Sequence, residues 1–215
     1  MDQSREEILN RIRAALDGVP RTPVSPLPPG MRVPPRTAGE VNAEIDLLIA
    51  EIGKLGGRAQ RVAGHEELRL ALCNLVRDES VKKVALWPSS DLKDFDLENT
   101  LASLGVEIVA ANADKRTLAE CDLGVTGADA ALPETGTLIL RAASEHPQLV
   151  SLLPRVHLAI VRPAALRADL HQVLDEVKGD PRVHFVSGPS RTADIEKTLV
   201  IGVHGPQALH VWVYV

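Results

Sequence analysis

The feature that most constrains the fold is an alternation, from residue 40 onwards, between amphipathic helical segments and short aliphatic segments. Apolar residues recur every three or four positions over residues 41–55, and Gly56-Gly57 then predicts the end of a helix. Further helices are predicted at residues 66–77, 97–104 and 117–120, and strands at 58–63, 81–87, 106–110 and 123–126. This alternation predicts an α/β domain whose sheet is mainly parallel and flanked by helices.

The pattern changes after Gly124. Two apolar segments, 123–132 and 137–142, flank Pro133-Glu-Thr-Gly136, which predicts a hairpin and therefore a mixed sheet. Beyond the hairpin, the spacing predicts helices at 148–153, 164–177 and 190–199, and strands at 156–161, 183–186 and 210–215.

Residues 1–39 differ in kind from the rest. Ser4 and Glu7 have the spacing of a capping box, and Ile8, Ile12 and Leu16 recur at helical intervals, so a helix is predicted over 4–16. A proline-dense segment follows up to Gly39 and is expected to be extended. We therefore predict a helix with a proline-rich arm over 1–39 and an α/β domain over 40–215. The arm is either a tether or a contact that makes a homo-oligomer.

Composition excludes several classes of function. A net charge of -5 and only two Trp, two Phe and one Tyr disfavour a nucleic-acid partner. No apolar run approaches the roughly 18 residues that cross a bilayer, so no membrane partner and a cytoplasmic location are expected. Two cysteines cannot by themselves ligate a four-cysteine cluster, and no zinc spacing is present, so no metal and no cofactor are predicted for this chain.

Three loops carry the residues suited to ligand chemistry. Glycines allow a close backbone approach, and hydroxyl, guanidinium and imidazole groups supply donors. If these loops meet, they make one pocket for a small carboxylate or phosphate. The predicted ligand-binding residues are Thr126, Gly127, Thr135, Gly136, Thr137, Ser187, Gly188, Ser190, Arg191, Thr192 and Gly205.

The anion site depends on Arg191, whose planar donor fork follows Ser190 at the start of the predicted helix. Simple capping by Ser190 or Thr192 is the alternative. Asp194 and Glu196 would lie in the first turns of that helix. There they complement its dipole, and Glu196 is also a candidate to support Arg191 or His204.

Two residues are candidates for catalysis. His204, between glycines on a tight loop, suits acid–base chemistry or an oxyanion donor, and its alternative is a turn histidine that bonds the backbone. Glu134, at the predicted hairpin tip, suits a general base or a covalent nucleophile, and its alternative is an ordinary turn residue.

Taken together, Gly124-Val-Thr-Gly-Ala-Asp129, Glu134-Thr-Gly-Thr137, Ser187-Gly-Pro-Ser-Arg-Thr192 with its continuation to Glu196, and Gly202-Val-His-Gly-Pro206 resemble the lactate-utilisation protein C family of LUD-domain proteins. The resemblance covers roughly residues 40 to 215. It implies a fold similar to the ribose-5-phosphate isomerase, glucosamine-phosphate deaminase and CoA-transferase group.

The same resemblance implies a role in oxidising L-lactate to pyruvate beside partner proteins that carry iron–sulfur clusters. This chain would be an accessory or small-anion-binding subunit. Two other functions remain open: a free-standing enzyme on a CoA-transferase or folate cyclo-ligase-like scaffold using Glu134, and a regulatory ligand-binding module.

Overall fold

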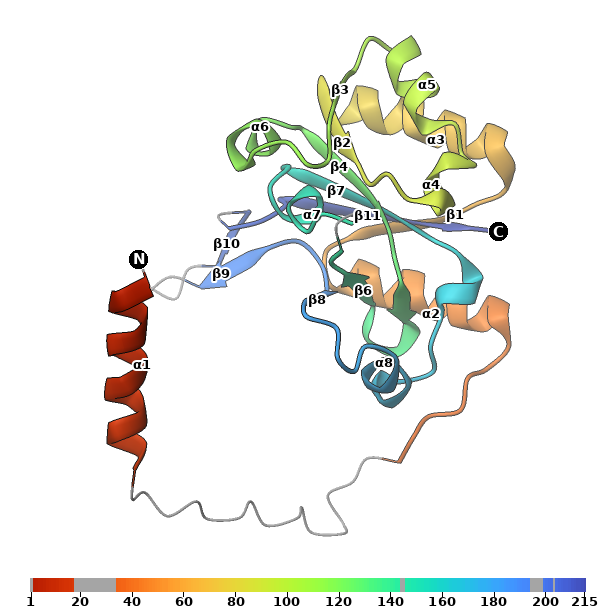
Figure 1. Cartoon of the computed structure of the whole chain (residues 1–215). Coiled ribbons are helices and arrows are strands. Elements are labelled where there is room, and N and C mark those ends of the chain that lie inside the picture. Colours follow the sequence, from red (N-terminus) through yellow and green to blue (C-terminus); the bar gives the residue numbers. More distant parts are fainter. Residues whose placement is uncertain (1, 18–33, 144–145, 194–198, 203) are drawn as a thin grey trace. The chain divides into compact units, whose positions relative to one another are not determined.

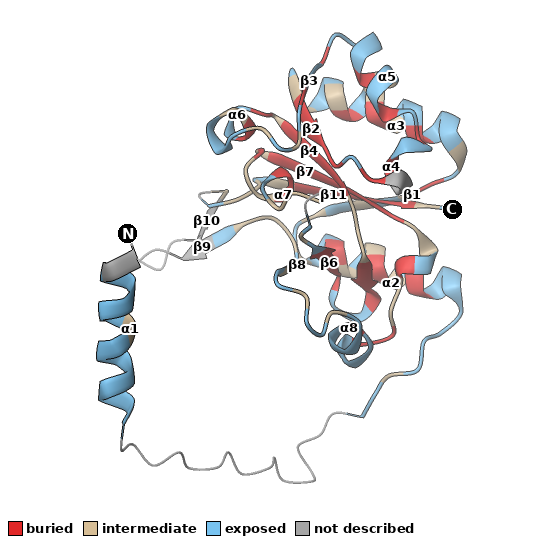
Figure 2. Cartoon of the chain, viewed as in Figure 1, coloured by how far each residue is buried: buried red, intermediate tan, exposed pale blue. Residues whose placement is uncertain are grey.

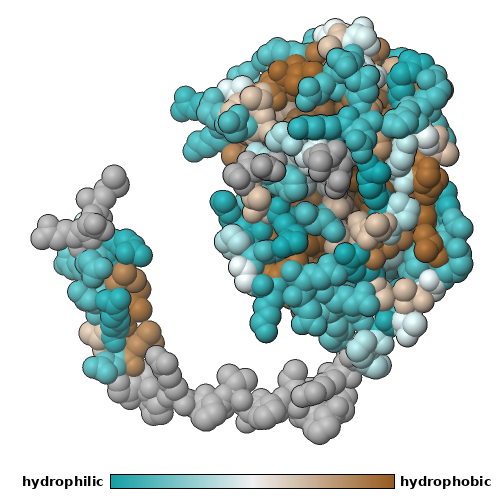
Figure 3. All heavy atoms as spheres, turned by 45° about the vertical axis from the view of Figure 1, so that its right-hand side comes forward, coloured by the Kyte–Doolittle hydropathy of each residue, from teal (hydrophilic) through white to brown (hydrophobic). Residues whose placement is uncertain are grey.

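A computed structural model describes residues 2–17, 34–143, 146–193, 199–202 and 204–215. The chain divides into two units, residues 1–34 and 35–215 (Figure 1). The first unit contains helix α1, Asp2–Leu16, which confirms the predicted helix. Its Ile8, Ile12 and Leu16 side chains are exposed and form an apolar stripe along the helix (Figure 3). Residues 18–33, most of the predicted arm, lie outside the described residues.

The second unit is built on a six-stranded sheet in which every neighbouring pair is parallel. The strand order is β1-β11-β7-β4-β2-β3. The central strands are buried on both faces (Figure 2), as their continuous aliphatic sequences predict. The bounds are β1 Arg58–Val62, β2 Lys83–Leu86, β3 Glu107–Val109, β4 Leu123–Gly127, β7 Val156–Val161 and β11 Ala208–Tyr214.

Helices cover both faces of this sheet (Figure 1). Leu68 and Leu72 of α3 and Leu101 of α5 bury their side chains in the core on one face, and Ile45 and Leu48 of α2 do so on the other. The helices are α2 Val41–Lys54, α3 Gly64–Asp78, α4 Ser90–Lys93, α5 Leu97–Ser103, α6 Lys115–Ala119, α7 Leu149–Leu152 and α8 Leu170–Glu176. The predicted α/β class with a mainly parallel sheet is confirmed.

The predicted hairpin is also confirmed, but it does not make the parallel sheet mixed, because it belongs to a separate antiparallel sheet of order β5-β6-β8. Leu132 pairs with Thr137 across the turn, which is a 3₁₀ segment, Pro133–Thr135, closed by Gly136. The strands are β5 Ala130–Leu132, β6 Thr137–Arg141 and β8 Val183–Val186.

The predicted helix at 190–199 is wrong where the structure describes it. Strand β9, Arg191–Ala193, pairs antiparallel with β10, Leu199–Ile201. The capping signal at Ser190 is local, whereas β-branched Val200 and Ile201 supply a partner strand that the local pattern does not include. Pairing between the two segments therefore overrides the helical spacing.

The predicted helix at 164–177 is divided into a 3₁₀ turn, Pro163–Ala165, and α8. Between them the backbone N–H of Arg167 donates to the carbonyl of Ala131 at 2.9 Å, which ties the chain to β5. Asp169 then begins a new helix, since its carboxylate accepts from the backbone N–H of Gln172 at 3.2 Å.

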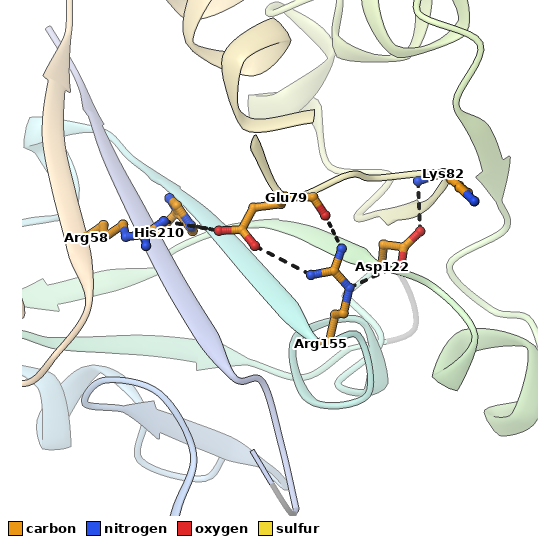
Figure 4. A network of polar contacts seen from close by, with 6 residues as sticks. All are labelled: Arg58, Glu79, Lys82, Asp122, Arg155 and His210. Carbon is orange, nitrogen blue, oxygen red and sulfur yellow. Dashed lines mark hydrogen bonds and ion pairs between the residues drawn. The ribbon is translucent and has the colours of Figure 1, made fainter. Parts of the chain in front are cut away.

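Polar contacts fasten the amino-terminal edge of the parallel sheet (Figure 4). The Glu79 carboxylate contacts Arg58 at 3.1 Å, His210 at 3.3 Å and Arg155 at 3.5 Å. Asp122 bonds Arg155 Nε at 3.2 Å and also accepts from the backbone N–H groups of Lys82 and Lys83. These groups lie just before or near the starts of β1, β11, β7, β4 and β2, so they satisfy one another at this edge.

Candidate functional site

The opposite, carboxyl-terminal edge of the sheet contains a cavity of about 360 Å³. After β2 the chain moves to β3 on one side, and after β4 it moves towards β7 on the other. The loops after β2 and β4 therefore diverge, and this is the point where open parallel sheets bind ligands. The cavity is lined by Trp87, Ser89, Leu92, Phe95, Gly127, Ala128, Asp129, His146, Ile160, Arg162, Ala164 and Ala165.

Ser89 is the most informative residue of this lining. It follows β2 and is 6% exposed, yet among the residues that the structure describes its Oγ has no hydrogen-bond partner. A buried hydroxyl without a partner costs about 1–3 kcal/mol. Ser89 is one of the residues that line the cavity, so a polar group of a ligand bound beside it would supply the missing partner.

Arg162, the residue after β7, supplies positive charge to the same cavity. Its guanidinium carbon lies 4.8 Å from the centre of the Phe95 ring and 5.8 Å from that of Tyr214. Its Nη2 also lies 3.3 Å from the carboxylate of Asp94. Stacking on the two rings holds the guanidinium in one orientation. A charged fork held in this way suits a carboxylate.

Aromatic side chains are concentrated at this edge. The Trp87 indole N–H donates to the carbonyl of Pro147 at 3.0 Å, which fixes the ring. The imidazole of His146 lies parallel to it, with ring centres 4.4 Å apart and an interplanar angle of 7°. The ring centres of Phe95 and Tyr214 are 4.6 Å apart. In a chain with only two Trp, two Phe and one Tyr, this clustering distinguishes the cavity from the rest of the core.

Asp129 adds a negative group to the lining, but its carboxylate already has a structural contact. Its Oδ2 accepts from the backbone N–H of Arg141 at 2.7 Å. Gly127, a predicted binding residue, lines the cavity as well. Thr126, another predicted binding residue, is not part of this lining. Its hydroxyl lies 2.8 Å from Nε2 of buried His157. Burial lowers the pKa of His157 to about 4.

The hairpin residues lie at a different cavity, of about 330 Å³, lined by Glu134, Thr135, Thr137 and Ser187 among others. The Thr137 hydroxyl is 2.8 Å from that of Thr135 and 2.8 Å from that of Ser187. The predicted loops at 133–137 and 187–192 therefore meet here. Glu134 is exposed, and its role as base or nucleophile stays a prediction.

Gly136 has a structural reason to be glycine. Its φ is +61°, and a Cβ there would lie 2.8 Å from the backbone nitrogen of Ile52. The hairpin tip therefore packs directly on α2, so turn geometry and close packing account for this glycine.

Arg191 contacts the end of α2. Its guanidinium donates to the carbonyl of Leu55, the residue that ends this helix. A Cβ on Gly188 would lie 2.9 Å from the same carbonyl oxygen. Since Arg191 and Thr192 begin a strand, the predicted helix start is wrong, and Arg191 satisfies a terminal carbonyl, while anion binding by Arg191 stays a prediction.

The predicted loop at 202–206 meets the predicted loop at 187–192. The backbone N–H of Ser190 donates to the carbonyl of Pro206 at 2.9 Å. His204 and Gly205 line a further cavity, of about 610 Å³, beside Asp122 and Arg155 at the amino-terminal edge. Asp194 and Glu196 lie outside the described residues. The expected single pocket is therefore not formed by the described residues: Gly127, Thr135 and His204 line three different cavities, and Thr126, Ser190 and Arg191 line none of these three.

Trp87, Ser89, His146 and Arg162 line the cavity at the carboxyl-terminal edge but are not among the site residues predicted from the sequence. Three of them have a signal that could have been used. Trp87 and Ser89 stand at and just after the end of the predicted strand 81–87, and Arg162 directly follows the strand 156–161. Because the carboxyl ends of parallel strands share one edge of the sheet, polar residues that follow such strands are candidates for a common site.

Neither a metal centre nor a membrane span emerges from the described part of the chain. Within the described ranges, no group of three or more His, Cys, Asp or Glu side chains is placed to hold a metal ion. Likewise, no described helix has the length and apolar character to cross a bilayer.

Comparison with known proteins places this fold in a family. The "Lactate utilization protein C" of Shouchella clausii is 31% identical over 224 residues, covering 96% of this chain and 95% of that protein. The protein of the same name from Halalkalibacterium halodurans is 33% identical over 152 residues, 66% of each chain. A crystal structure of a DUF162 family protein from Deinococcus radiodurans has the same fold, with a TM-score of 0.61 and 19% identity over 83% of this chain and 100% of that one.

The LUD domain family matches residues 45–214, which include the whole parallel sheet and the carboxyl-edge cavity. With the Shouchella clausii relative matching almost end to end, this chain belongs to the LUD domain family.

Proposed function

We propose that this chain takes part in L-lactate utilisation in the cytoplasm, as a subunit that binds an organic carboxylate beside partner proteins that carry iron–sulfur clusters. The names of the relatives from Shouchella clausii and Halalkalibacterium halodurans support the role in lactate utilisation. In this proposal the partner proteins hold the iron–sulfur clusters, and this chain binds the carboxylate.

The observation that supports a carboxylate ligand is that Ser89 and Arg162 line the same cavity. Arg162, stacked on Phe95 and paired with Asp94, brings positive charge, and the buried Ser89 hydroxyl, which has no partner among the described residues, offers a hydrogen bond. A carboxylate would satisfy the hydroxyl and meet the positive charge. The apolar and aromatic remainder of the lining suits the carbon skeleton of an organic acid.

Growth tests the lactate role. Deleting the gene from its host is expected to abolish growth on L-lactate as the sole carbon source while leaving growth on pyruvate unchanged. The wild-type gene should restore growth, and the Ser89→Ala variant should restore it poorly at an equal protein level. Normal growth of the deletion strain on L-lactate would contradict the role.

Purification tests the partners. The tagged full-length chain, isolated anaerobically from cells grown on L-lactate, is expected to bring down proteins with the visible absorption of iron–sulfur clusters. The same chain purified alone should lack that absorption. Recovery of the chain without any cluster protein, at protein levels where growth is normal, would rule out a stable complex.

A further inference from the structure

We propose that the carboxyl-edge cavity recognises a flat aromatic carboxylate, and that the imidazole of His146 lies where the ring of this ligand would stack on Trp87. This inference rests on the proposed carboxylate site and adds the kind of carbon skeleton that the site prefers. It also assigns His146 as a residue that competes with the ligand.

The parallel stack of His146 on Trp87 is the first observation. Ring centres 4.4 Å apart and planes inclined by only 7° show that the indole accepts a flat ring in a parallel, offset stack. The indole is itself held by its hydrogen bond to Pro147 and is 3% exposed. The face that accepts a ring is therefore fixed in place, and the ring that covers it belongs to a half-buried residue on a loop.

The size of the cavity is the second observation. A volume of about 360 Å³ lies in the range of about 300–1,000 Å³ that is typical of pockets for ligands larger than L-lactate. L-lactate alone would leave much of this space to water. A ring that displaces the imidazole of His146 would cover the indole, and its carboxylate would extend into this space towards Arg162 and Ser89.

The electrostatics agree with this arrangement. Arg162 lies over the rings of Phe95 and Tyr214, so the positive charge is presented from an aromatic wall. The carboxylate would bind towards Arg162 and Ser89, and the ring would lie on Trp87. Offset-stacked aromatic contact contributes about 0.5–1.5 kcal/mol beyond buried area, so a flat ring gains over a puckered ring of equal size.

Benzoate and cyclohexanecarboxylate are the probes that separate these contributions. Both are monoanions with the same ring size, and only benzoate is flat. Calorimetric titration of the full-length wild-type chain is expected to show benzoate binding about fivefold more tightly. His146→Ala is expected to tighten benzoate binding further by about threefold, because the competing ring is gone. Trp87→Leu should reduce the ratio between the two acids to near one.

Trp212→Phe serves as the control, since it alters the other tryptophan and should keep the wild-type ratio. Thermal unfolding of each variant establishes that it is folded. Equal affinity for both acids, with both lost in Ser89→Ala, would overturn the ring site and leave the carboxylate site standing. Weaker benzoate binding in folded His146→Ala would overturn the proposal that the imidazole of His146 competes with the ring of the ligand. Binding of neither acid to the wild type would overturn both the ring site and the carboxylate site.

Discussion

The hydroxyl of Thr126 lies 2.8 Å from Nε2 of His157, and both side chains are almost completely buried, at 0% and 1% exposure. They lie on neighbouring strands β4 and β7 of the parallel sheet. Within the described chain, Nδ1 of His157 has no hydrogen-bond partner. Burial disfavours the charged imidazole, and the pKa of His157 is lowered from 6.5 to about 4.

This relationship predicts that stability falls in mild acid. The unfolded chain binds a proton at His157 near pH 6.5, whereas the folded chain does so only near pH 4. Between those values the unfolded state holds more protons, so the free energy of unfolding decreases as the pH falls. Over this pH interval the free energy of unfolding decreases by about 3 kcal/mol. Burial lowers the pKa of His210 too, which acts in the same direction although Glu79 opposes it.

Urea unfolding at pH 7.5 and pH 4.5 measures this difference. His157→Gln should reduce the pH dependence, although it lowers stability at neutral pH because the site is packed. His204→Gln, at an exposed histidine, is the control and should leave the pH dependence unchanged. A wild-type chain equally stable at both pH values would contradict the burial of a neutral imidazole.

Gly124→Ala is expected to be strongly destabilising. A Cβ at this position would lie 1.9 Å from the carbonyl oxygen of Val150, so α7 would have to move off β4. Forcing an extra methyl group into a packed contact costs about 1–3 kcal/mol, and this backbone contact belongs at the upper end.

Gly53→Ala provides a matched control in chemical denaturation. Gly53 lies inside α2, and a Cβ there meets no atom within 4 Å among the described residues. Alanine should stabilise the helix by about 0.5–1 kcal/mol. If both substitutions changed the midpoint equally, the close packing of α7 on β4 would be wrong.

Glu79→Gln is expected to destabilise the amino-terminal edge of the sheet. The Glu79 carboxylate is largely buried and contacts Arg58, Arg155 and His210. Removing its charge leaves Arg155 with Asp122 as its remaining described carboxylate contact. The expected loss is about 2 kcal/mol of unfolding free energy.

Glu66→Gln tests whether any ion pair would behave in the same way. Glu66 and Arg69 form an exposed pair one helical turn apart on α3, and solvent screens such pairs. No measurable change in the thermal midpoint is expected. A comparable loss in both variants would show that the network of Glu79 has no special role.

Ser89→Ala should separate binding from stability. Its hydroxyl is buried without a described partner, so replacing it should leave the folded chain unchanged or stabilise it by about 1 kcal/mol. The same change should weaken benzoate binding. Differential scanning calorimetry with and without benzoate measures both effects. Marked destabilisation without ligand would indicate that the hydroxyl has a structural partner.

Much of the fold was predictable because its signals are local. The aliphatic runs that became β2, β4 and β7, and the helical spacing of α2 and α3, are visible without any knowledge of contacts. The turn at residues 133–136 was predictable for the same reason, since proline and glycine restrict the backbone directly. The helix expected at 190–199 failed because its competitor, the pairing of Arg191–Ala193 with Leu199–Ile201, is not local.

The sequence alone determined the α/β class, the family motifs and the aliphatic core, because periodicity and composition act along the chain. Only the tertiary structure decided which polar residues share a cavity. Gly127 lies with Ser89 and Arg162, whereas Thr135 and His204 line other cavities. The physical reason is that strand order, and with it the meeting of loops at one edge, follows from long-range packing that no single segment encodes.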